Sequence, residues 1–122
     1  MPSSSKTGDA VYRTKKAEVE FLHIPNGRNL KVKMKKYYNN QDFECDLMLT
    51  EEPIESMVIA TPFKKDKHFY YNQKIVGFKV SGYFKVGDFV YNYNKDNTVG
   101  LLDWGRGVWT YKNRWYWGAG AG

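Results

Sequence analysis

The sequence predicts an all-β fold, an antiparallel barrel or sandwich made of many short strands. Three observations lead to this prediction. Apolar residues recur at every second position over most of the chain, turn-forming residues interrupt these runs, and no stretch shows a helical period with caps. A chain of 122 residues with 42% hydrophobic and 17% aromatic residues has the size and composition of one globular domain.

The first predicted strands form a hairpin. Residues 1–9 are small, polar and unpatterned, so we expect a flexible tail there and an antiparallel β domain over residues 10–122. Ala17–His23 alternates between apolar and polar residues and ends at the turn signal Pro25-Asn26-Gly27. Leu30–Lys35 alternates in the same way after the turn, which is the pattern of two paired strands.

Four more runs of the same kind follow. Phe43–Leu49 and Met57–Phe63 are separated by a polar loop, and Val76–Val86 shows the clearest alternation. Gly87-Asp88 is typical of a two-residue turn and leads into Phe89–Tyr93. In a barrel or sandwich, the apolar side of such strands either fills the interior or lines a pocket for an apolar ligand.

The stretch Gly100–Gly118 is dense in aromatic residues and contains all four tryptophans. We expect a strand that reaches Trp117, with these aromatic positions on one face: Trp109, Tyr111, Trp115 and Trp117. The face is either an aromatic core layer or the lining of a cavity for a lipid, isoprenoid or other planar apolar molecule. Base stacking is disfavoured because the neighbouring basic residues alternate to the opposite face. A strand at the end of the chain is also expected to be an exposed edge that promotes self-association, or to continue in a longer protein.

An acidic and a basic residue, Asp103 and Arg106, stand among glycines in this stretch. The plainer interpretation is a turn in which Asp103 accepts backbone hydrogen bonds and pairs with Arg106. The functional interpretation makes Asp103 a proton donor or acceptor in an apolar pocket, where burial raises its pKa and Arg106 opposes that shift. Gly105 and Gly107 fit a sharp bend or a bulge.

The remaining features restrict the partners. The net charge of +6 favours anionic molecules, but the basic runs Lys31–Lys36 and Lys64–Lys67 accompany no nucleic-acid-binding motif, so no specific nucleic-acid partner is expected. His23 and His68 are isolated, the spacing fits no metal site, and we expect no cofactor. Cys45 lies on an apolar face and has no second cysteine to pair with. No segment resembles a signal peptide or a transmembrane span, so we expect a soluble, cytoplasmic protein.

Three segments resemble the family catalogued as domain of unknown function 2804. They are Phe69–Lys74, which contains an aromatic-Tyr-x-Gln-Lys pattern, the Val80–Tyr83 region, and Leu101–Gly118. The last segment is similar to the family signature Leu-Asp-x-Gly-Arg-Gly-x-Trp-x-Tyr-x-x-x-Trp-x-Trp. The matching positions extend over Lys64–Gly118, and the N-terminal half resembles the family in its strand pattern alone.

The resemblance implies a fold and a ligand class. The family is similar to the lipocalin-like carotenoid hydratase and tocopherol cyclase group, which handles isoprenoids in β-barrel cavities, so a lipocalin-like barrel or sandwich is implied. Family members are also much longer. This length implies that the chain is an incomplete portion of a larger β domain, truncated at its C-terminal end.

We therefore expect a module that binds an apolar, lipid-like or isoprenoid ligand in an aromatic-lined β cavity. Arg106 is expected to meet a polar or anionic end of the ligand, and the aromatic lining is Trp104, Trp109, Tyr111, Trp115 and Trp117. Two alternatives stay open. One is a hydratase-like or cyclase-like enzyme that uses Asp103 as an acid on an isoprenoid-like substrate, and the other is a structural or interaction domain without a ligand.

Overall fold

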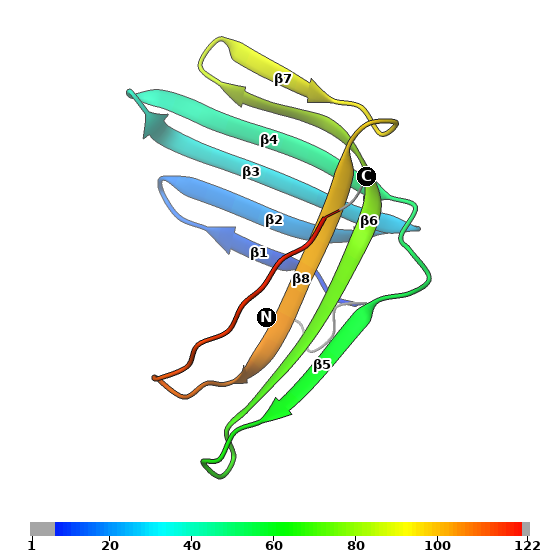
Figure 1. Cartoon of the computed structure of the whole chain (residues 1–122). Helices are drawn as coiled ribbons and strands as arrows, with labels where there is room; N and C mark the ends of the chain where they lie inside the picture. Colours follow the sequence, from blue (N-terminus) through cyan, green and yellow to red (C-terminus); the bar gives the residue numbers. More distant parts are fainter. Residues whose placement is uncertain (1–6, 121–122) are drawn as a thin grey trace.

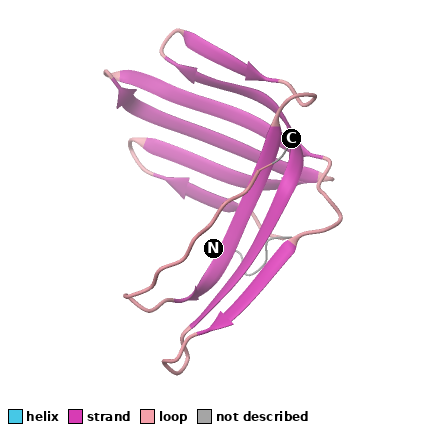
Figure 2. Cartoon of the chain, in the orientation of Figure 1, coloured by secondary structure: helices cyan, strands magenta, loops and turns pink. Residues whose placement is uncertain are grey.

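The computed structural model of the chain describes residues 7–120, which form a single antiparallel sheet of eight strands with no helix (Figures 1 and 2). The strands are β1 (Ala10–Arg13), β2 (Ala17–Ile24), β3 (Gly27–Tyr38), β4 (Gln41–Thr50), β5 (Met57–Pro62), β6 (Phe69–Val86), β7 (Phe89–Tyr93) and β8 (Val99–Val108). The prediction of an all-β, antiparallel fold is confirmed. The sheet is not closed into a barrel. Within the described part of the chain, no helix is long and apolar enough to cross a membrane.

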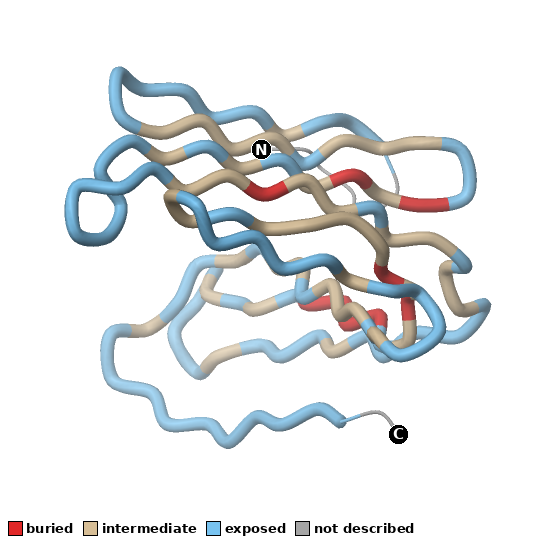
Figure 3. Tube along the Cα trace, turned by 90° about the horizontal axis from the view of Figure 1, so that it is seen from above, coloured by how far each residue is buried: buried red, intermediate tan, exposed pale blue. Residues whose placement is uncertain are grey.

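The strand β6 organises the sheet because it pairs with four other strands. Its C-terminal half pairs with β4 and β7, and its N-terminal half pairs with β5 and β8. The first half belongs to a six-stranded layer in the order β1-β2-β3-β4-β6-β7, and the second half belongs to a three-stranded layer in the order β5-β6-β8. Figures 1 and 3 show the two layers at an angle to each other, joined by the bent β6.

Two glycines allow β6 to bend. Gly77 and Gly82 have φ angles of 117° and 122°, in a region that residues other than glycine rarely adopt. The pairing of β6 with β8 shifts register between Val76 and Phe78, so Gly77 is the extra residue of a β-bulge. At Gly82 the backbone of Asp46 approaches so closely that a Cβ atom would overlap its carbonyl oxygen. The bend therefore depends on two backbone conformations that favour glycine, and at Gly82 a side chain would also meet the backbone of Asp46.

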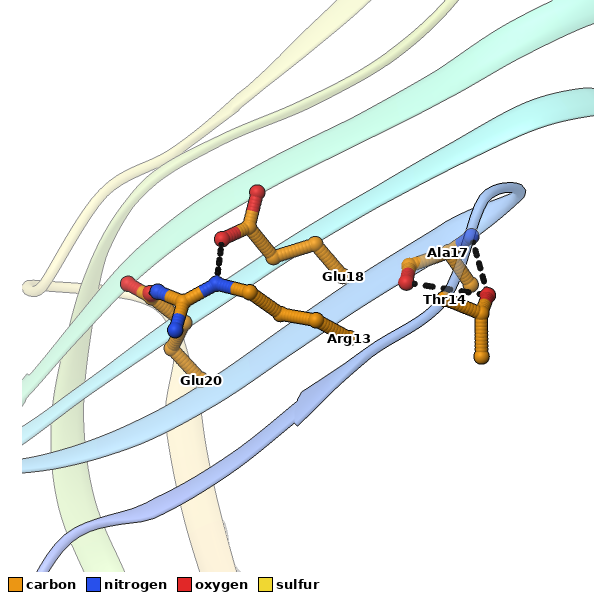
Figure 4. A network of polar contacts seen from close by, with 5 residues as sticks. All are labelled: Arg13, Thr14, Ala17, Glu18 and Glu20. Carbon is orange, nitrogen blue, oxygen red and sulfur yellow. Dashed lines mark hydrogen bonds and ion pairs between the residues drawn. The ribbon is translucent and has the colours of Figure 1, made fainter.

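One face of the six-stranded layer, here called the outer face, carries charges of alternating sign. The register places these residues side by side across five strands: Arg13, Glu18, Lys33, Glu44 and Lys85. Figure 4 shows the start of this row, where Arg13 pairs with Glu18 and Glu20. In the adjoining turn, the Thr14 hydroxyl oxygen accepts the backbone N–H of Ala17 at 2.9 Å. Opposite charges on neighbouring strands favour this register, and a slip by one residue would bring the charges to the other face.

The other face of the layer, here called the inner face, is apolar. One row across it consists of Val19, Val32, Cys45, Phe84 and Tyr91. The fully or almost fully buried apolar side chains gather at the bend of β6 and beside it: Cys45, Ile75, Phe78 and Val80. Cys45 is buried as the sequence predicts, and burial raises the pKa of its thiol. The rest of the inner face is half-buried or exposed, so the hydrophobic core of this chain is small.

The predicted strands coincide with β2 to β7, but the sequence does not predict β1, and several strands are longer than predicted. β3 spans Gly27–Tyr38, and β6 begins at Phe69, seven residues before the predicted run. Of the predicted tail, residues 1–6 lie outside the described part, and the Asp9 carboxylate accepts the backbone N–H of His23 at 2.8 Å.

The prediction of a strand that reaches Trp117 is wrong. β8 ends at Val108, and residues 109–118 form an irregular segment, here called the C-terminal segment. Val108 pairs with Phe69, the first residue of β6, so the described residues after Val108 have no further β6 residue opposite them. The strands at the edges of the sheet are β1, β5, β7 and β8.

Replacing Gly82 by alanine tests the bend. The added Cβ atom would overlap the Asp46 backbone and strain a positive φ, so the free energy of unfolding should fall by about 2–4 kcal/mol in urea titrations. Gly118→Ala is the control, because a Cβ atom there meets nothing within 4 Å, and it should leave stability unchanged. Equal free energies of unfolding for the two variants would contradict the requirement for glycine at position 82 in the bend.

Candidate functional site

The predicted site residues of β8 divide between the two faces of the three-stranded layer. Trp104 and Arg106 follow Gly100 at every second position, and a Cβ atom on Gly100 would touch Val80 and Phe78 on the inner face. Asp103 points to the outer face. It lies three positions from Arg106, and an odd separation along a strand places two side chains on opposite faces. The predicted pairing of Asp103 with Arg106 is therefore wrong.

The inner face of this layer holds a groove of about 590 Å³, here called the inner groove. Its lining comes from all three strands: Ala60, Thr61, Pro62, Phe69, Tyr70, Tyr71, Trp104 and Arg106. By the alternation along β5 and β6, Thr61 and Tyr70 belong to the outer face, and they also line a cavity there. The rings of Tyr71 and Trp104 meet edge to face, with 6.0 Å between centroids and an interplanar angle of 79°. Such a pair presents a rigid aromatic wall, and Arg106 is the one charged residue among the described groove residues.

The outer face of the layer holds a polar cluster of Asn72, Lys74 and Asp103. Lys74 Nζ lies 2.5 Å from Asp103 Oδ2, and the Lys74 side chain is only 7% exposed. The Asn72 side-chain amide donates to Asp103 Oδ1 and, at 2.9 Å, to the carbonyl oxygen of Trp104. Because both acceptors face Nδ2, the orientation of the Asn72 amide is fixed, and its buried Oδ1 accepts no hydrogen bond from the described residues.

The environment of Asp103 keeps it ionised. Burial favours the neutral acid and raises the pKa, but the hydrogen bonds from Lys74 and Asn72 and the charge of Lys74 outweigh it, so the pKa of Asp103 lies below its ordinary value. A carboxylate in this state has no proton to donate at neutral pH. This arrangement argues against the acid role considered from the sequence, because Asp103 also faces away from the inner groove.

The C-terminal segment runs along the outer face of the three-stranded layer (Figure 3). None of its residues lines the inner groove. Trp115 stacks on Tyr70 at 6.2 Å, Trp109 lies 5.3 Å from the same ring, and the Trp117 ring lies 4.5 Å from Lys74 Nζ. Between the segment and the strands lies a cavity of about 380 Å³, lined by Lys74 and Asp103 among others. These contacts tether the segment to β6 through stacking on Tyr70 and a cation–π interaction with Lys74.

The five predicted aromatic residues therefore do not share one lining. Trp104 alone lines the inner groove, whereas Trp109, Trp115 and Trp117 lie against the outer face. Tyr111 is fully exposed. These exposed rings do not form the aromatic core layer that was the alternative interpretation of the stretch.

Gly105 and Gly107 have a different role from the predicted bend or bulge. Both lie within β8, in regular register with β6, and neither has a positive φ. A Cβ atom on Gly105 would come within 3.1 Å of the Asn72 amide nitrogen and of the Tyr70 ring. On Gly107 it would overlap the carbonyl oxygen of Phe69. The two glycines let Asn72 and Tyr70 pack directly on β8.

Sequence reasoning missed the partners that β6 supplies, namely Tyr70, Tyr71, Asn72 and Lys74. A signal for them was present. Tyr70, Asn72 and Lys74 occupy every second position of Phe69–Lys74, one of the segments that carry the family resemblance. Neither histidine joins the site, and among residues 7–120 no three His, Cys, Asp or Glu side chains gather as metal ligands would.

The comparisons with known proteins extend the family resemblance to the whole chain. The model of a family described as domain of unknown function DUF2804 matches residues 1–122, beyond the C-terminal half on which the sequence resemblance depends. No curated protein and no solved structure matches the chain.

Removing the charge of Asp103 tests the polar cluster. Asp103→Asn leaves the buried Lys74 without its counterion, and the free energy of unfolding should fall by about 1–3 kcal/mol at pH 7, less than for a fully buried pair because the Asp103 side chain is 40% exposed. Glu18→Gln breaks an exposed pair and should cost less.

The contribution of the Lys74–Asp103 pair to stability depends on pH. The lowered pKa of Asp103 adds stability that is complete above its ordinary value of 3.8 and disappears as the pH falls through the lowered value. The difference between the original protein and Asp103→Asn should therefore shrink in urea titrations below pH 3.8. A difference that persists unchanged in acid would show that charge is not its cause.

Proposed function

The chain belongs to the DUF2804 family, and from the geometry of its inner groove we propose that it binds an apolar, lipid-like or isoprenoid molecule with an anionic end. The observation that carries the proposal is the position of Arg106 beside the Trp104–Tyr71 pair, in a groove otherwise lined by uncharged residues. Aromatic and aliphatic walls favour an apolar body, and a guanidinium at one point favours a carboxylate or phosphate.

Size and position support the same proposal. A groove of about 590 Å³ falls in the range of small-molecule sites. It lies on the apolar side of the bent sheet, away from the charged rows, so a ligand there removes apolar protein surface from water. The buried, reduced state expected of Cys45 fits the cytoplasm as the proposed compartment.

Binding is favoured over catalysis. An acid-catalysed reaction needs a proton donor within reach of the ligand. Among the described groove residues there is no Asp, Glu, His or Cys, and Asp103 lies ionised on the opposite face. The position and the ionised state of Asp103 support the proposal of a binding role over a reaction that uses Asp103 as the acid.

Replacing one tryptophan on each face distinguishes binding in the inner groove from binding in the outer cavity. In calorimetric titrations with a long-chain fatty acid, Trp104→Ala should weaken binding by about tenfold or more, since it removes one wall of the groove. Trp117→Ala, on the outer face, should leave the affinity unchanged. Circular dichroism confirms that both variants are folded. Equal losses from the two, or no binding by the original protein, would contradict the proposal.

Arg106 should determine the preference for an anionic end. The original protein is expected to bind the fatty acid more tightly than the matching fatty alcohol. Arg106→Gln should abolish that preference while affinity for the alcohol stays the same. Lys64→Gln, in a loop that contributes nothing to the groove, is the control for net charge. An unchanged preference in Arg106→Gln would contradict the proposed role.

A further inference from the structure

The inner face of the six-stranded layer is built for burial but is largely open. Its three central rows hold no charged residue, whereas the outer face of the same strands carries the alternating charges. The rows are Ala17, Met34, Phe43, Val86 and Phe89; Tyr12, Val19, Val32, Cys45, Phe84 and Tyr91; and Ala10, Phe21, Leu30, Leu47, Gly82 and Tyr93. An antiparallel sheet with one charged and one apolar face normally covers the apolar one.

An aromatic cluster stands in the middle of these rows. Phe84 is the central ring, and four others surround it at 5.8–6.3 Å: Phe43, Phe89, Tyr91 and Tyr93. Phe89 is still 60% exposed and Tyr91 50%. Clustered, rigid and accessible aromatic rings are typical of the energetically dominant centre of a protein interface.

The exposed area is large enough for a stable interface. The chain exposes 9359 Å², whereas a compact monomer of 14.3 kDa exposes about 6,800 Å². The excess is about 2,500 Å², to which the C-terminal segment contributes a part, while a standard interface covers about 800 Å² on each partner. The exposed area therefore exceeds what a standard interface between two chains needs.

We infer that this inner face binds a second copy of the chain, face to face, with the Phe84 clusters of the two copies in contact. A two-fold axis would bring the same uncharged rows together, so that no charge is buried despite the net charge of +6 on each copy. Two apolar sheet faces packed in this way form a β-sandwich with the charged outer faces in water. The inference stands on the six-stranded layer and does not depend on the proposed ligand.

Two neighbouring residues of β7 provide a matched test. Tyr91 points to the inner face beside Phe84, and Val90 points to the outer face beside Lys85, with similar exposures of 50% and 47%. In sedimentation equilibrium, without added lipid, the original protein should have twice the chain mass of 14.3 kDa. Tyr91→Lys should give the monomer mass, because it places a charge in the contact, and Val90→Lys should remain a dimer.

The same samples provide the control for folding and the results that would contradict a dimer. Circular dichroism verifies folding, and the Tm of the original protein should rise with protein concentration, as expected when association is linked to folding. A monomer at all concentrations from about 1 to about 50 µM, where a dimer with a micromolar Kd associates, would overturn the inference. It would equally be overturned if both variants dissociated alike, which would indicate pairing through the β7 edge, or if Tyr91→Lys stayed a dimer.

Discussion

The bend of β6 is the constraint on which the rest of the structure depends. One continuous strand supplies the hydrogen bonds for β4 and β7 in its C-terminal half and for β5 and β8 in its N-terminal half. Backbone groups buried in a sheet must find partners, so the four neighbours follow β6 wherever it turns. Because Gly77 and Gly82 let it turn, the apolar sides of both layers come to face the same concave space.

The alternation of side chains along the bent strand then separates two kinds of chemistry. Ile75, Phe78 and Val80 close the inside of the bend, next to the groove at Trp104. Asn72 and Lys74 point to the outside, where Asp103 neutralises a buried ammonium group and Trp117 covers it. The outer cluster thus holds β6 to β8 and anchors the C-terminal segment, while much of the apolar surface on the inner side stays exposed.

The sequence predicted local structure better than it predicted the site. Alternating residues in Leu30–Lys35 or Val76–Val86 report burial on one side of a strand, and this local signal was sufficient to find them. The same period, extended past Val108, produced a strand that does not exist, since alternation says nothing about whether a hydrogen-bonding partner is available. Asp103 was paired with its nearest cation, Arg106, although Lys74, 29 residues earlier in the chain, lies directly across the sheet. That contact depends on strand register, which no local pattern records.

We propose that ligand recognition belongs to the inner side of the bend and that the outer aromatic residues are structural. The four indole N–H groups allow it to be tested in one spectrum, because each tryptophan gives a separate proton–nitrogen NMR signal that Trp→Phe variants assign. On addition of a long-chain fatty acid, the Trp104 signal should shift while those of Trp109, Trp115 and Trp117 stay in place. Shifts of the three outer signals with Trp104 unchanged would contradict it.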